Sequence, residues 1–173
     1  MPVSALQTPI LMMLQTEDAL KIKSNKALDF IIRIVNKTAA TYMSRPYDND
    51  HVQMATVGLP NGGTKTVISS QCLWSMYRGS SSLSMPYLLQ SMHMALEKYL
   101  LDLMSEQGNN NTEEVRSYLH QILEEAESCS LIAIVASVVT AYPDEFFEES
   151  LLLMQDIQFL EMDMMRSNRE ISI

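Results

Sequence analysis

The stretch SCSLIAIVASVVTAYP, residues 128–143, decides the fold because it presents no continuous polar face to water between Leu131 and Val139. A helix that is apolar on every side must be buried. About a dozen apolar residues are too few for the roughly 20 that are needed to cross a bilayer, so this helix is expected to pack against protein. The rest of the chain is therefore expected to surround it.

Most segments on either side of this stretch have the pattern of amphipathic helices. Apolar residues recur at three- and four-residue steps, and charged residues lie mainly on the opposite side. The polar run TEDALKIKSN, residues 16–25, is expected to separate the first two helices, and Asn111 is expected to cap a later one. Helices are predicted over residues 4–16, 24–44, 71–79, 85–107, 112–128, 145–155 and 157–165.

Residues 52–69 change from the helical pattern to that of a β-hairpin. Two short β-prone runs flank the turn sequence PNGG at residues 60–63. The predicted fold is therefore mainly α. It consists of antiparallel helix pairs in a HEAT-like or irregular helical bundle, with one small β-hairpin insertion at about residues 52–69.

The loop between Gly58 and Thr66 has the outer glycine spacing of a phosphate-binding loop, GxxxxGK[ST]. Thr64 occupies the lysine position of that motif, and Lys65 follows one residue late. A phosphate loop also needs backbone amides that converge at a helix N-terminus, and no helix clearly follows this loop. A plain turn is the favoured interpretation. Nucleotide binding by this loop, with Lys65 and Arg78 as weak candidates, is the alternative.

Composition indicates one domain, residues 1–173, of an ordinary folded protein, with 47% hydrophobic and 19% charged residues. Cys72 and Cys129 lie far apart without a metal-binding motif, which favours packed thiols in a reducing compartment. The N-terminus lacks the basic start and long apolar core of a signal sequence, so the cytoplasm is the predicted location. No membrane contact is expected.

Charge is distributed unevenly along the chain. Residues 1–86 contain eight Lys and Arg and five Asp and Glu, a net charge of +3, whereas residues 87–173 contain four and 16, a net charge of −12; together these give −9. An acidic half repels phosphate backbones, which argues against nucleic-acid binding there. Glu124, Glu125 and Glu127 lie near the end of a predicted helix, where they oppose its dipole. They are candidates for contact with a basic partner, and a solvated face is the simpler interpretation.

Two further groups of residues have the composition of possible sites. Trp74 and Tyr77, with Arg78 beside them, could stack on a ligand, although a short helix with core aromatics is the favoured interpretation. His120 and Glu124 have the i,i+4 spacing of metal ligands but no third ligand, so a solvated pair is favoured and no metal site is predicted. The acidic run from residue 144 to residue 149 is interpreted as adjacent exposed carboxylates. No catalytic residue and no cofactor are predicted.

Four phrases of the sequence resemble a helical region of very large bacterial P-loop ATPases of the STAND or NACHT-like kind. They are ALDFIIRIVN (27–36), LWSMYRG (73–79), SMHMALEKYLLDL (91–103) and CSLIAIVASVVTAYPDEF (129–146). In such proteins this region is similar to a helical scaffold distant from the nucleotide site. The resemblance implies a segment of a larger protein, and it implies no catalytic residue in this chain.

The leading hypothesis is a non-enzymatic helical scaffold or protein–protein interaction domain that forms part of a larger ATPase. Its expected partner is another protein, the remaining domains of a longer chain, or a second copy in a homodimer. Interaction candidates are Trp74, Tyr77, Arg78 and the three glutamates of residues 124–127. The alternatives are a nucleotide-dependent domain that uses the loop from Gly58 to Thr66, and a small-ligand pocket around Trp74 and Tyr77.

Overall fold

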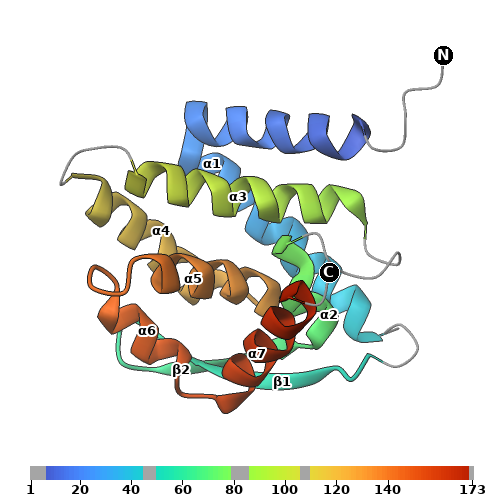
Figure 1. Cartoon of the computed structure of the whole chain (residues 1–173), viewed down its shortest axis with the longest axis vertical. Coiled ribbons are helices and arrows are strands. Elements are labelled where there is room, and N and C mark those ends of the chain that lie inside the picture. The colour runs from blue at the N-terminus through green and yellow to red at the C-terminus, as the bar shows by residue number, and fades with distance from the viewer. Residues whose placement is uncertain (1–6, 45–49, 79–85, 106–109, 172–173) are drawn as a thin grey trace.

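The computed structural model describes residues 7–44, 50–78, 86–105 and 110–171. These ranges form a mainly helical, irregular bundle with one antiparallel β-hairpin along its edge, which confirms the predicted fold class (Figure 1). None of the described helices is both long and apolar enough to span a membrane. The elements are α1 (Gln7–Ser44), β1 (Gln53–Gly58), β2 (Thr64–Ser69), α2 (Gln71–Trp74), the 3₁₀ helix η1 (Ser75–Arg78), α3 (Tyr87–Ser105), α4 (Asn110–Glu125), α5 (Cys129–Ala141), α6 (Phe147–Leu153) and α7 (Ile157–Ile171).

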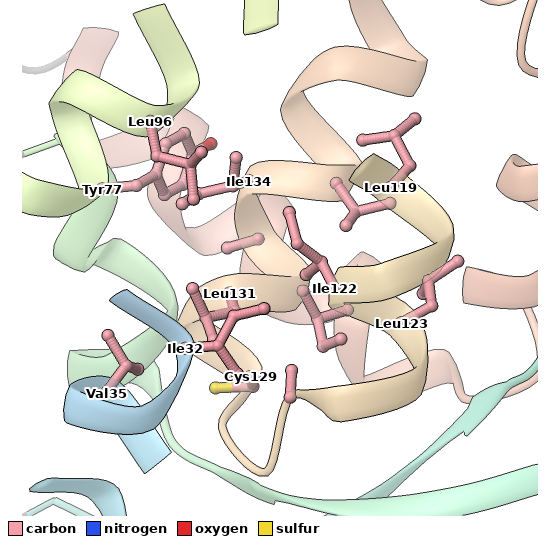
Figure 2. Packing of buried hydrophobic residues seen from close by; sticks show 14 of the residues in the cluster. Ile32, Val35, Tyr77, Leu96, Leu119, Ile122, Leu123, Cys129, Leu131 and Ile134 are labelled. Atoms are coloured by element: carbon pink, nitrogen blue, oxygen red, sulfur yellow. The ribbon is translucent and has the colours of Figure 1, made fainter. Parts of the chain in front are cut away.

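The central element is α5, the apolar helix that the sequence predicts to be buried. It contacts α2, α3, α4, α6, η1 and β2, and all side chains of residues 129–135 are buried. Figure 2 shows Leu131 and Ile134 of α5 among side chains of α1, α3 and α4, including Ile32, Leu96 and Ile122. The prediction that neighbouring helices enclose this stretch is confirmed.

Element α1 consists of two helical segments that meet at a kink. The kink is at Lys23, with φ −145° and ψ 59°, so the break between the first two helices lies inside the polar run 16–25, as predicted, whereas the first segment extends beyond its predicted end at residue 16. Glu17 faces α3 and is buried, with its carboxylate 2.7 Å from Lys21 Nζ and 3.1 Å from Lys98 Nζ. Hydrogen bonds from Lys21 and Lys98 lower the pKa of Glu17. These ion pairs let the first segment of α1 continue as helix against α3 beyond residue 16.

The start of α4 also differs from the prediction. Asn111 lies inside the helix, which begins at Asn110, and its side-chain amide donates a hydrogen bond to the Leu103 carbonyl of α3 (2.8 Å). The expected capping role for Asn111 is therefore wrong. On its other side, α4 contacts α1 through a 2.7 Å hydrogen bond between Tyr118 Oη and Ser24 Oγ.

The hairpin lies where the sequence predicts it, and its inner face is part of the core. Gln53 to Gly58 pair in register with Ser69 to Thr64, and Ala55, Val57 and Val67 are buried. The Ile68 amide donates to the Glu127 carbonyl (2.8 Å), which joins β2 to the link between α4 and α5. Two helices that are far apart from the hairpin in sequence, α4 and α5, therefore hold it against the bundle.

The last two helices, α6 and α7, pack across the hairpin and α5 (Figure 1). Asp156 precedes α7 and accepts hydrogen bonds from the Thr56 amide of β1 (2.8 Å) and the Gln158 amide (3.0 Å). A Cβ atom on Gly58 would lie 2.7 Å from Gln155 Nε2 and 3.0 Å from Leu152 Cα. Glycine is therefore required for α6 to approach β1 this closely.

Both cysteines are free thiols. Cys129 is buried in the core, and burial raises the pKa of its thiol to about 12. Cys72 is half-buried. Two separate packed thiols are what the sequence predicts.

Replacing Leu131 by alanine tests the central position of α5. The variant is expected to lose about 3 kcal/mol of unfolding free energy, because a fully buried leucine leaves a cavity that neighbours fill only in part. Urea denaturation measures this loss. Thr140→Ala, at an exposed position of the same helix, is the matched control and should change stability by less than about 0.5 kcal/mol. Similar losses in both variants would show that α5 is not enclosed.

Candidate functional site

The loop that resembles a phosphate-binding motif is a plain hairpin turn. The Leu59 amide donates to the Gly63 carbonyl (2.8 Å), and the Gly62 amide donates to the Leu59 carbonyl (3.0 Å). Gly62 has φ +87°, a conformation that glycine adopts without strain. Strand β2 follows the turn directly, so no helix N-terminus faces the loop. The interpretation of this loop as a turn is confirmed.

Lys65 lies on β2 near the acidic end of α4. Partial burial lowers the pKa of its amino group to about 8, and the negative charges of Glu127, Glu124 and Glu125 oppose that shift. The same carboxylates would repel a phosphate group placed at Lys65. Lys65 of the chain itself thus supplies positive charge close to the three glutamates.

The two aromatic side chains of the LWSMYRG phrase are buried in the core, as the favoured interpretation predicts. The guanidinium groups of Arg78 and Arg166 lie over the Tyr77 ring, 5.1 and 5.8 Å from its centroid. Arg78 Nη2 also lies 3.6 Å from Glu97 Oε1 on α3. Tyr77 and Arg78 therefore join η1 to α3 and α7.

Trp74 lines an apolar groove between α6 and α7, over the C-terminal half of α5, which is named here the α6–α7 groove. Its volume is about 390 Å³. The rings of Trp74 and Phe159 stack at 5.3 Å, and Trp74 Nε1 donates to Asp163 Oδ1 (3.4 Å). Tyr77 is not among the lining residues. Those that define the groove are Trp74, Val139, Phe147, Met154, Phe159 and Leu160.

The surface around this groove contains an unusual share of exposed apolar side chains. Fourteen large hydrophobic side chains are exposed in the described residues, and seven of them lie within residues 147–165. Three of them follow three- and four-residue steps along α6 to its C-cap Met154, and three do so along α7, where Met165 adjoins Met164. Exposed apolar side chains are thus concentrated on these two helices. The seven residues are Phe147, Leu151, Met154, Ile157, Leu160, Met164 and Met165.

A second groove follows the bend of α1. Its volume is about 760 Å³, and it is lined by α1 residues on both sides of Lys23 together with Leu88 and Met92 of α3. Lys23 and Lys26 contribute positive charge to it. It contains no buried aromatic side chain comparable to Trp74.

A buried carboxylate that the sequence analysis places at the surface joins α4 to α6. Glu149 is 1% exposed, and its Oε1 lies 2.6 Å from Arg116 Nη1 and 2.8 Å from His120 Nε2. Burial favours a raised pKa for Glu149, but the hydrogen bonds from Arg116 and His120 hold it below the ordinary value. The prediction of an exposed run is wrong here. His120 binds Glu149, not Glu124 as a solvated pair would require.

A second buried polar group has the appearance of a serine nucleophile. His93 Nδ1 donates to the Leu89 carbonyl (2.7 Å), so Nε2 is free to accept from Ser130 Oγ (2.9 Å). Ser130 Oγ in turn lies 2.9 Å from Ser128 Oγ. All three side chains are fully buried, and burial lowers the pKa of His93 to about 4. No substrate can reach this serine, so the arrangement joins α3 to the start of α5.

Within the described ranges, no group of three or more His, Cys, Asp or Glu side chains is arranged to hold a metal ion. Comparison of the sequence with models of known protein families finds no match. Comparison with curated proteins likewise finds no significant match. The resemblance to helical regions of large bacterial ATPases therefore stays a prediction.

The pKa of Lys65 predicts a pH dependence of stability. Its folded value of about 8 lies below the ordinary 10.5, so the unfolded chain keeps a proton that the folded chain has released between these values. Rising pH then favours folding. Relative to Lys65→Met, the wild-type protein should gain unfolding free energy from pH 8 to 10.5, as urea denaturation measures. Thr66→Ala, at an exposed neighbour, is the control; a flat difference for Lys65→Met would contradict the assignment.

Proposed function

We propose that this chain is a non-enzymatic helical scaffold that binds another protein through the α6–α7 groove. The observation that carries the proposal is the groove itself. It has an aromatic floor of Trp74 and Phe159, and half of the exposed large hydrophobic side chains of the described residues lie on the helices around it. Such a surface is costly to leave in water, and a protein partner would cover it.

The placement of the polar side chains supports a structural role for the rest of the bundle. Glu149 is held by Arg116 and His120, and Ser130 is held by His93. Each of these groups connects two helices and lies away from the grooves. Their contacts stabilise the frame on which α6 and α7 are mounted.

The partner in this proposal is a protein in the cytoplasm, or another domain of a longer chain. The resemblance to helical regions of large bacterial ATPases supports the second form, because a scaffold segment would present its apolar surface to adjoining domains. A second copy of this chain is a further candidate partner. In each case the α6–α7 groove is the contact surface.

Photo-cross-linking in cells tests this proposal. A benzoylphenylalanine at position 147 replaces an exposed aromatic ring at the groove and should form a covalent adduct with a polypeptide on irradiation. The same group at position 43, which is 50% exposed on α1, is the matched control. Adducts are measured by denaturing electrophoresis. Equal yields at the two positions, or none at 147, would contradict the proposal.

A small apolar ligand in the α6–α7 groove is the second candidate function. It is favoured by the groove volume of about 390 Å³, which is typical of pockets for drug-sized molecules, and by the presence of Trp74 in the lining. The leading proposal predicts the bare chain mass in native mass spectrometry. A bound organic molecule that is lost in Thr140→Phe, where a larger side chain fills the groove, would support the second candidate instead.

A further inference from the structure

We infer that the occupant of the α6–α7 groove is an amphipathic helix whose apolar face is flanked by lysine or arginine. This inference rests on the proposed function and deepens it, because it names the chemistry of the partner. It depends on the charge around the groove, on the hydrogen bonding of the groove walls and on the kinds of side chains that line it.

The exposed charges on the helices around the groove are mainly negative, and the nearby arginines bind within the chain. Residues 140–165 contain three Asp and four Glu and no Lys or Arg. Asp144, Glu145, Glu148 and Glu161 are exposed, and none of them forms a salt bridge within the described residues. Two arginines lie close by: Arg166 is 2.9 Å from Asp163, and Arg116 is 2.6 Å from Glu149 and donates to the Glu145 carbonyl (2.7 Å). A partner with basic flanks would meet these four carboxylates, whereas an acidic partner or an anionic membrane would be repelled.

Exposed carboxylates adjoin the apolar stripes. Asp144 follows the lining residue Pro143 in the turn before α6, and Glu148 follows Phe147 on α6, where one residue is a rotation of about 100° around the helix axis. Glu161 is four residues from Ile157 and three from Met164, so it shares the face of the α7 stripe. A complementary partner therefore carries positive charges next to its apolar stripe.

The groove walls favour a helix over an extended strand. The walls are the helices α6 and α7, whose backbone amides and carbonyls bond within each helix. An extended peptide would find no row of free backbone groups to pair with, and its own would remain unsatisfied against apolar side chains. A helix satisfies its own backbone and offers side chains at three- and four-residue steps. Met154 in the lining and Met164 near it can adapt to such side chains.

A designed peptide tests the inference on the intact chain. The probe is an 18-residue helix of Leu and Lys with Leu at i, i+3, i+4 and i+7. A control peptide has Glu in place of Lys, and a second has the same composition with Leu and Lys in alternation. Trp74 is the single tryptophan of the chain and lies in the groove, so its emission reports binding. The first peptide should bind with a dissociation constant below about 100 μM, and the two controls at least about tenfold more weakly.

Variants place the binding at the groove. Phe147→Ser and Leu160→Ser remove side chains that are 62% and 46% exposed, so the fold should be retained, and each should weaken binding about tenfold. Met43→Ser, 50% exposed on α1, is the control and should leave binding unchanged. Glu148→Lys with Glu161→Lys should weaken the Lys peptide and strengthen the Glu peptide. Asp18→Lys, an exposed reversal on α1, should do neither.

Three results would overturn the inference. The first is binding of the Glu peptide as tight as that of the Lys peptide, and the second is a loss of binding in Met43→Ser as large as in Phe147→Ser. The third is that neither helical peptide binds and Phe147→Ser converts a dimer into monomers in sedimentation velocity, which would assign the groove to a second copy. The proposed function fails separately. A specific adduct at position 147 without binding of the Lys peptide would retain a protein contact and remove its basic helical character.

Discussion

The apolar side chains of α5 leave water only because other elements enclose them. Full burial of a large aliphatic side chain is worth roughly 1.5–3 kcal/mol, and α5 contains Leu131, Ile132, Ile134 and Val135 within five residues, all buried. The first two turns of α5 have no solvent face, so neighbouring elements must approach them from every direction. The irregular bundle follows from that requirement, because α2, α3, α4, α6, η1 and β2 all contact the same short rod.

Several buried polar side chains of the described residues bind one another across the core. His93 reaches Ser130 at the start of α5, Glu17 holds α1 on α3 through Lys98, and Glu149 holds α6 on α4 through Arg116. A buried carboxylate without its partner would be strongly unfavourable, so each pair also fixes the positions of two helices. The shape of the groove is thus a consequence of how α6 is fixed to α4 and α5.

The sequence predicts the helices, the hairpin and the burial of α5, because each depends on the spacing of neighbouring residues. It fails where the outcome depends on a residue far away in the chain. The first helix is predicted to end near residue 16, yet Lys98 pairs with Glu17 and the helix continues to the break at Lys23. The error at Glu149 was avoidable: Phe146, Glu149 and Leu153 lie three and four residues apart, which places the carboxylate on the inward face.

The α6–α7 groove was beyond prediction from sequence. The sequence indicates Trp74 as a candidate, but the other lining residues of the groove come from α5, α6 and α7, and their proximity depends on the turns between those helices. Tyr77, three residues from Trp74, faces a different part of the core. Their closeness in sequence therefore suggests a shared site for Trp74 and Tyr77, although the fold separates them.

The contact between Asp156 and the Thr56 amide has a consequence for how this surface can change in evolution. It makes one wall of the groove an extension of the hairpin, and Gly58 sets how closely the two approach. A substitution in the strands can therefore widen or narrow the groove while every side chain that lines it stays the same. The width of the groove can change in evolution independently of its lining.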